Sequence, residues 1–334
     1  MRSHPLLHQY IYVLVIHVMC QSYAQHINIC WDDERDHSIL HGRPSMHIQT
    51  LCVFLFLLAC MLPQVRQVAS TAPWRGSPLS HAECLLRIMQ SRGSLSPLLT
   101  APWVTSMIFR MDWLHISDLG VAPDFLGNFF HAILPLFPGS TKQERCASLN
   151  AELQEYYVSE DVSDRYDNLC LTFFEPKDSA YKLKGGAAKI RALVPFAWKL
   201  AQEMLDVNLP AHAAMKQAAF HLNEVYNALS ASHPSPCATM KEHGIKFAIQ
   251  YVALYDYLHH LDDKAWRIKP KLHLFLHITS DNSIPRLTWT YRDEDFGGSV
   301  ARMARRRGNL LKCGSTSKSC LERFKLANPC IRIK

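Results

Sequence analysis

The stretch Met111-Asp112-Trp113-Leu114-His115-Ile116-Ser117-Asp118-Leu119-Gly120-Val121 decides how this chain is interpreted. It follows a short apolar run, Val104 to Phe109, which predicts a buried strand. A carboxylate just past a buried strand is held rigidly at the edge of a sheet. Enzymes that cut phosphodiesters use clustered carboxylates to hold two Mg²⁺ or Mn²⁺ ions. Asp112, with His115 and Asp118, is therefore the first candidate site.

A second acidic group, Asp293-Glu294-Asp295, follows an expected strand near the end of the chain. Such a group suits a final metal ligand, but acids are also routine at the start of a helix, where they favour the helix dipole. Asp112 has structural alternatives as well, because an aspartate can cap a helix or pair with an arginine such as Arg110. Taken alone, each acidic group favours its structural interpretation. Taken together, they form a candidate metal-ligand set.

Composition indicates a folded chain with a mild positive charge. Of the 334 residues, 48% are hydrophobic and 19% are charged, and the net charge is +7. The 11 cysteines lie at irregular spacing, which predicts free thiols in a reducing compartment. Arginines cluster near the end of the chain, where they predict either phosphate contacts or a solvated basic face. These candidate nucleic-acid-binding residues are Arg302, Arg305, Arg306 and Arg307.

Two apolar runs precede residue 70, from Tyr10 to Ile16 and from Leu51 to Leu62. The second is short for a membrane span, which needs about 20 residues, and it reaches marginal length only when counted over residues 48–65. Three interpretations compete for this region. It is a membrane anchor, a buried element of the main domain, or a wrongly assembled gene start joined to a genuine domain. We favour the third.

Apolar residues at helical spacing predict helices over much of the remaining chain. Thr141 and Glu144 form a capping-box signature, and Pro195 is expected to kink a helix. The run from Lys271 to Ile278 is too short to decide between strand and helix, whereas the alternation from Arg286 to Tyr291 predicts a strand. The expected helices cover residues 80–90, 122–137, 141–157, 186–206, 210–230, 236–261 and 296–307.

Several short motifs occur in one order between Ser96 and Gly308, and together they resemble the transposase-like proteins of cut-and-paste mobile elements, CACTA-like and related groups. The family carries an Asp-x-x-His followed by a Gly-Val at the point where this chain has Asp112, His115 and Gly120-Val121. The other matching stretches are Phe125-Leu126-Gly127-Asn128, Lys184 to Arg191, Leu193 to Ala197, Lys269 to Phe275 and Tyr291 to Gly297.

This resemblance implies an RNase H-like fold with three acids, a helical insertion before the last acid, and two-metal cleavage and strand transfer of DNA. Asp112 would be the second acid, Glu294 or a neighbour the last, and His115 would support them. The expected metal ligands are Asp112, Asp293, Glu294 and Asp295, with Mg²⁺ or Mn²⁺. No first acid or DNA-reading domain is evident upstream, so the resemblance implies a truncated and inactive copy.

The fold class expected from these arguments is α-rich α+β, a remnant RNase H-like sheet with a large helical-bundle insertion. The expected parts are a leader (1–78), a strand-helix part with Asp112 (79–140), the helical insertion (141–262), a closing strand-helix part (263–311) and a flexible tail (312–334). The expected function is that of a degenerate transposase-like protein that binds DNA, nuclear or otherwise intracellular. The alternative is a non-catalytic helical scaffold held to a membrane by residues 48–65.

Overall fold

The computed structural model describes residues 111–175, 180–229 and 235–281 without gaps, together with residue 233 and separate pieces of 68–99 and 284–298. The chain divides into two compact units, one formed by Ile48–Trp289 and the other by Met1–His47 with Thr290–Lys334. In the second unit the described residues are limited to short pieces between 290 and 298. The larger unit therefore holds nearly all of the described residues.

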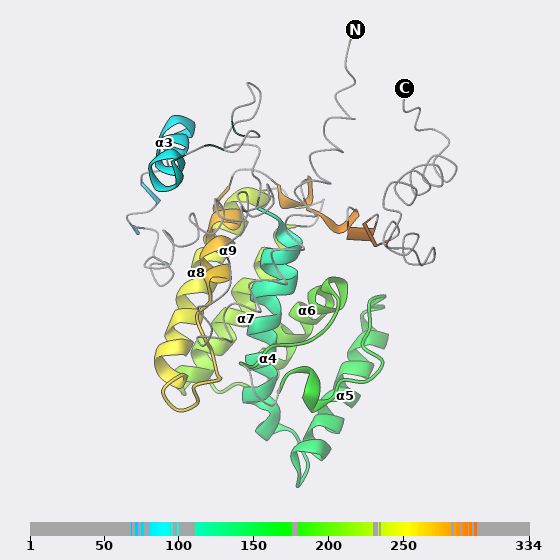
Figure 1. Ribbon diagram of the computed structural model, residues 1–334. Coiled ribbons are helices and arrows are strands. Elements are labelled where there is room, and N and C mark those ends of the chain that lie inside the picture. Colours follow the sequence, from blue (N-terminus) through cyan, green and yellow to red (C-terminus); the bar gives the residue numbers. More distant parts are fainter. Residues whose placement is uncertain are drawn as a thin grey trace, which may run out of the picture. The chain divides into compact units, whose positions relative to one another are not determined.

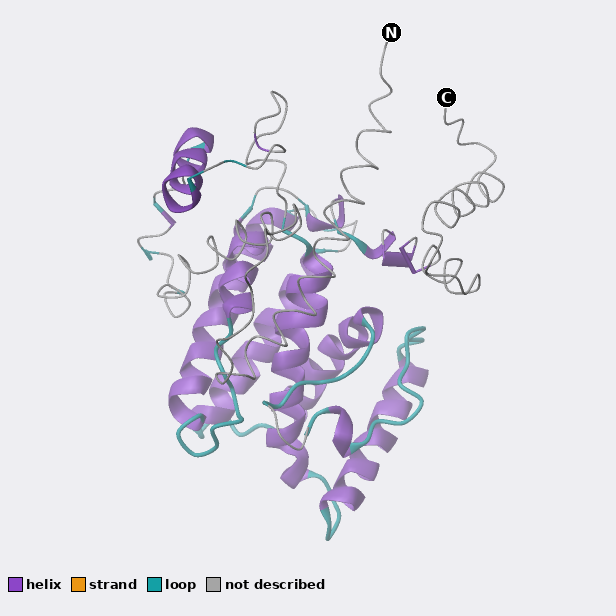
Figure 2. Ribbon diagram, viewed as in Figure 1, coloured by secondary structure: helices purple, strands orange, loops and turns teal. Residues whose placement is uncertain are grey.

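The described part of the larger unit is helical (Figures 1 and 2). Its α-helices are α3 (His81–Arg92), α4 (Ala122–Ile133), α5 (Lys142–Ser159), α6 (Ala187–Met204), α7 (Pro210–Ala228), α8 (Pro236–Leu258) and α9 (Pro270–Ser280). A π-helix, η5 (Leu114–Val121), precedes α4 directly. Short 3₁₀ turns are η6 (Leu134–Leu136), η7 (Leu171–Phe173) and η8 (Pro285–Leu287).

The expected α+β fold with an RNase H-like sheet is wrong, because the described residues contain helices and loops but no strand (Figure 2). The run Val104 to Phe109 lies outside the described residues, as do most of residues 296–307. The expected strand from Arg286 to Tyr291 begins instead in the 3₁₀ turn η8, with Leu287 81% exposed. Alternating residues form a strand only if a neighbouring strand pairs with them, and the described residues offer none.

The helices predicted from apolar spacing between residues 80 and 261 are confirmed as α3 to α8. The expected helix at residues 296–307 lies mostly outside the described residues. The capping box of α5 is present, since the Thr141 hydroxyl accepts from the Glu144 amide and the Glu144 carboxylate accepts from the Thr141 amide. Helix α6 runs through Pro195. The ambiguous run Lys271 to Ile278 belongs to a helix, α9, in which Leu272, Phe275 and Leu276 are buried. Between α5 and α6, the regular structure in the described residues is the turn η7.

The helices surround one aromatic-rich core. Neighbouring helices contact one another in the order α4, α6, α7, α8, α9, and η5 contacts α4, α6 and α9 (Figure 1). Phe125 of α4 lies at the centre, with its ring 5.6 Å from those of Phe129 and Phe247 and 5.9 Å from that of Trp266. The π-helix therefore contacts both the first helix of this series, α4, and the last, α9.

An extended segment at residues 181–183 packs closely on α4. Leu183 donates its backbone N–H to the Pro123 carbonyl at 2.8 Å. A Cβ atom added to Gly127 would lie 2.5 Å from the Cα atom of Lys182, which is too close for any side chain. The glycine in the Phe-Leu-Gly-Asn motif is therefore required by backbone packing, and this packing fixes the position of Lys182.

The segment Leu114–Leu136, which joins η5, α4 and η6, is long and apolar enough to cross a membrane by length and composition. However, 72% of its most apolar window is buried within the protein. This degree of burial is typical of the central helix of a core. The apolar run at residues 48–65 lies outside the described residues.

Candidate functional site

The deciding stretch of the sequence forms the π-helix η5, in which backbone bonds join residues five apart, such as Ala122 N–H to the Ser117 carbonyl. Such helices are rare, and they are frequent at functional sites. The wider turn brings side chains five residues apart onto one face. Trp113 uses this spacing to donate its indole N–H to the Asp118 carboxylate at 3.1 Å. The π-helix therefore explains why Asp118 lies beneath Trp113.

Asp118 is the centre of a buried polar cluster, the Asp118 cluster, formed by Trp113, Ser117, Asp118, Arg191 and Tyr226. The Asp118 side chain is fully buried and pairs with the Arg191 guanidinium at 2.7 Å. The Tyr226 hydroxyl donates to the same carboxylate at 2.5 Å and lies 3.0 Å from the Ser117 hydroxyl. Burial raises the pKa of Tyr226 well above its usual value, and the nearby Asp118 charge adds to this effect. These partners hold η5 against α6 and α7.

Asp112 caps the start of the helix that continues into η5. Its carboxylate accepts from the His115 backbone N–H at 3.1 Å and more weakly from that of Leu114 at 3.4 Å. The same carboxylate lies 2.5 Å from Nδ1 of His115. The side chains of Asp112 and His115 are 13% and 20% exposed, so this pair lies near the surface. The helix-capping alternative for Asp112 describes this geometry.

Three lysines from two distant parts of the chain line one face of η5 and the start of α4. We call Lys182, Lys269 and Lys271 the lysine row. Lys271 donates to the His115 carbonyl at 3.0 Å, and Lys182 donates to the Leu119 carbonyl at 3.1 Å. Lys269 pairs with the Asp124 carboxylate at 2.8 Å. The acceptors at positions 115, 119 and 124 follow one another at close to one helical turn, so the ammonium groups form a column along the helix.

Lys271 carries charge that its surroundings only partly neutralise. Its stem lies across Gly120, where an added Cβ would meet Cδ of Lys271 at 2.6 Å. Within the described part of the chain, Lys271 forms no ion pair, and its ammonium is held by a neutral carbonyl. Burial and the like charge of Lys182 lower the pKa of Lys271 to about 8, and Lys269 adds to this effect. An anion placed beside the row would relieve this repulsion.

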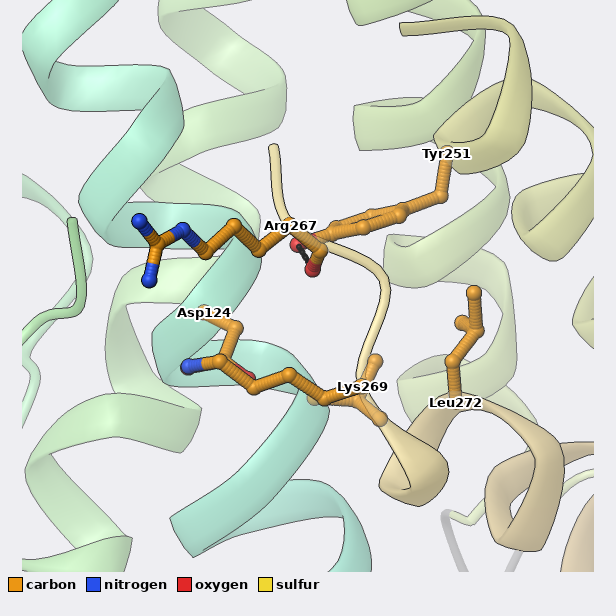
Figure 3. A pocket seen from close by; sticks show the side chains of 6 residues that line it. Asp124, Tyr251, Arg267, Lys269 and Leu272 are labelled. Atoms are coloured by element: carbon orange, nitrogen blue, oxygen red, sulfur yellow. Dashed lines mark hydrogen bonds and ion pairs between the residues drawn. The ribbon is translucent and has the colours of Figure 1, made fainter. Parts of the chain in front are cut away.

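A small pocket adjoins the lysine row at Lys269. It is lined by Val121, Asp124, Tyr251, Arg267, Lys269 and Leu272. Figure 3 shows the ion pair between Asp124 and Lys269 at one side of this pocket and the Tyr251 ring at another. The Tyr251 hydroxyl donates to the Arg267 carbonyl at 3.3 Å. The pocket is therefore a small recess between α4, α8 and α9, next to two cationic side chains.

The described acids do not assemble a two-metal centre. Over the residues that the structure describes, no group of three or more His, Cys, Asp or Glu side chains could hold a metal ion. The Asp112 carboxylate is engaged by backbone amides and His115, while Asp118 is engaged by Trp113, Tyr226 and Arg191. Among the described residues of the larger unit, the donors therefore do not fit the Mg²⁺ or Mn²⁺ that the resemblance implies.

The remaining predicted site residues lie in the smaller unit or outside the described residues. Glu294 and Asp295 are described, and the Glu294 backbone N–H donates to the Thr290 carbonyl at 2.9 Å, as in a helical turn. Both residues belong to the smaller unit, whereas Asp112 belongs to the larger one. Asp293 and the arginine cluster at residues 302–307 lie outside the described residues.

Sequence reasoning did not select the lysine row as a site. Lys269 and Lys271 flank Pro270 at the start of α9, within a motif that carries the family resemblance. Lys182 precedes another such motif. The signal that could have identified them was the pair of lysines at a helix start, where the helix dipole disfavours cations. Lysines at a helix start, where they oppose the helix dipole, indicate a role other than stabilising that helix.

Comparisons with known proteins identify no relative. No family model, no curated protein and no solved structure matches this chain.

Proposed function

We propose that this chain is a non-catalytic DNA-binding protein derived from a transposase-like protein of a mobile element. In this proposal the lysine row contacts the phosphate backbone. The motif order in the sequence supports the derivation from a transposase-like protein. The net charge of +7 supports binding to a polyanion. The engagement of Asp112 and Asp118 within the fold supports the absence of catalysis.

The observation that carries this proposal is the column of three ammonium groups along η5 and α4. Lys182 and Lys271 are half-buried, and in the described part of the chain each ammonium group donates to a carbonyl oxygen and forms no ion pair. Keeping cations together out of water is unfavourable unless an anion compensates for them. Phosphates spaced along a nucleic acid strand present such anions in a row. A row of cations therefore suits the spaced phosphates of a linear polyanion.

Binding of a fluorescent DNA duplex, measured by anisotropy across a series of salt concentrations, tests this proposal. We expect Lys182→Gln and Lys271→Gln each to reduce the slope of log affinity against log salt by about 0.9 for each phosphate that the variant no longer neutralises. Lys246→Gln is the matched control, because Lys246 pairs with Glu242 on the exposed face of α8. Circular dichroism verifies that each variant is folded.

Equal binding by the wild type and by both lysine-row variants would contradict the proposal. Loss of affinity in the Lys246→Gln control to the same extent would indicate a nonspecific charge effect instead. If no DNA binding is detected at low salt, the membrane scaffold becomes the leading alternative. That alternative predicts partitioning into lipid vesicles that is lost when residues 48–65 are deleted.

A further inference from the structure

We propose that Lys271 is a reactive amine that forms an imine with small phosphorylated aldehydes, with Lys182 and Lys269 holding the phosphate group. This inference rests on the lysine row, as the proposed function does, but it assigns a covalent chemistry to one member. It does not require that DNA be the ligand. The experiments below separate the two.

The Lys271 amine is held in a defined position. Its stem is fixed against Gly120, and its Nζ atom lies 3.0 Å from the His115 carbonyl oxygen. The side chain is half-buried rather than enclosed, and the neighbouring His115 side chain is 20% exposed. A small aldehyde can therefore approach from solvent toward an amine whose orientation is already set. Preorganisation of this kind favours reaction at one lysine over mobile surface lysines.

The charges around the Lys271 amine favour its neutral form. Asp124 is already paired with Lys269 at 2.8 Å, and Asp112 is engaged by His115 and by backbone amides. Lys271 thus has carboxylates nearby, but none pairs with it among the described residues. Burial and the neighbouring lysines lower its pKa to about 8. The neutral, nucleophilic form of Lys271 is therefore more populated at pH 7 than that of an ordinary lysine.

The chemistry is balanced without any further reactant. The lone pair of the neutral Nζ atom attacks the aldehyde carbon, and a C–N bond forms as the carbonyl oxygen takes up a proton. Loss of one water molecule from this carbinolamine then gives the imine. Lys182 and Lys269, the other two cations of the row, bring positive charge to the phosphate of the same molecule. The phosphate therefore raises the local concentration of the aldehyde at Lys271.

Labelling of the full chain with pyridoxal 5′-phosphate, reduced with borohydride and mapped by peptide mass spectrometry, tests this inference. We expect Lys271 to be labelled at pH 7 roughly tenfold or more faster than Lys142 and Lys246, whose side chains are 58% and 48% exposed. Its labelling rate should reach half of its maximum near pH 8. Phosphate-free pyridoxal should label Lys271 more slowly, and Lys182→Gln should reduce the advantage of the phosphorylated reagent.

Labelling of Lys271 at the rate of the two control lysines would overturn the inference. Equal rates with pyridoxal and its phosphate would overturn the assigned role of Lys182 and Lys269. The variant Lys271→Arg keeps the charge and removes the reactive amine, so no label should be found at position 271. Selective labelling of Lys271 without DNA binding would support this inference and contradict the proposed function. DNA binding without selective labelling would support the proposed function and contradict this inference.

Discussion

At the scale of single residues, the Asp118 carboxylate has no exposed surface and receives donors from the π-helix and from two other helices. A buried carboxylate is tolerated only when its hydrogen-bonding capacity is used. Tyr226 supplies one of these bonds, at 2.5 Å, and its hydroxyl also meets that of Ser117. The Asp118 cluster therefore joins η5 to α6 and α7 through hydrogen bonds that are shielded from solvent.

We expect Tyr226→Phe to lower the free energy of unfolding by about 2 kcal/mol, because it removes a hydrogen bond to a charged group while the ring is kept. Urea denaturation followed by circular dichroism measures this change. Tyr257→Phe is the control, since the Tyr257 side chain is 47% exposed and should tolerate the change. Equal stability of the two variants would show that Asp118 does not depend on this donor.

The histidine pair between α7 and α8 makes stability depend on pH. His221 is buried, and its Nδ1 atom lies 3.0 Å from that of His243. Burial lowers the pKa of His221 to about 4, and the neighbouring His243 and Lys246 add to the shift, while Glu242 opposes it. In the unfolded chain the pKa of a histidine is about 6.5. Below pH 6.5 the His221 side chain therefore binds a proton in the unfolded state but not in the folded state.

The free energy of unfolding should therefore fall as the pH falls from about 6.5 toward 4, and it should gain nothing from His221 above that range. Between pH 7 and pH 4.5 this residue accounts for about 2 kcal/mol. Urea denaturation at both pH values measures the total loss, and His221→Gln should make the loss smaller by that amount. The variant of an exposed histidine, His260→Gln, should leave the pH dependence unchanged.

At the scale of elements, local sequence signals predicted those helices whose causes are local. The Thr141 and Glu144 capping box and the apolar spacing of α7 and α8 are of this kind. The π-helix could not be predicted in the same way. It depends on partners more than 70 residues away, namely Arg191 and Tyr226. The sequence indicated that the Asp112 stretch was special, but not that its acids would be used for capping and for a buried cluster.

Gly127 tests whether α4 and the segment at 181–183 are held together by backbone packing. We expect Gly127→Ala to lower the free energy of unfolding by about 3 kcal/mol, since the added carbon meets backbone atoms of Lys182 and Leu183 that cannot rotate away. In a helix without such contact, the same change would stabilise by about 0.5–1 kcal/mol. Gly186→Ala is the matched control, because nothing lies within 4 Å of the added carbon there.

Thermal or urea unfolding of both glycine variants gives the comparison. A stable Gly127→Ala variant would mean that the segment carrying Lys182 can move away from α4. The lysine row would then not be preformed, because Lys182 could leave the Leu119 carbonyl. This result would weaken the proposed function as well as the packing argument.

At the scale of the whole molecule, the sequence predicted an α-rich chain but not the absence of a sheet from the described residues. The alternation from Arg286 to Tyr291 is a local pattern, and a strand is not a local structure. In the folded chain the Arg286 and Arg191 guanidinium groups lie 5.7 and 4.7 Å from the Trp289 ring centre. Trp289 thus packs against an arginine of the turn η8 and an arginine of helix α6. A strand at this position would have needed a second strand beside it.

The larger unit should fold without the smaller one. The buried hydrophobic core of the described residues lies between Val68 and Ile278, within the unit Ile48–Trp289. A domain that contains its own core can in principle fold alone. We expect a chain of residues 48–289 to show a helical circular dichroism spectrum and a cooperative urea transition. Its midpoint should lie close to that of the full chain, because the buried core of the described residues is kept whole.

The same shortened chain separates the two parts of the candidate site. It keeps Asp112, His115 and the lysine row, and it lacks Glu294, Asp295 and the arginine cluster. If the row is the main contact with DNA, the shortened chain should retain most of the salt-dependent binding of the full chain. If the arginines dominate, binding should disappear while the transition in urea is unchanged. A broad, non-cooperative transition would instead show that residues outside 48–289 complete the core, and the division into two units would have to be abandoned.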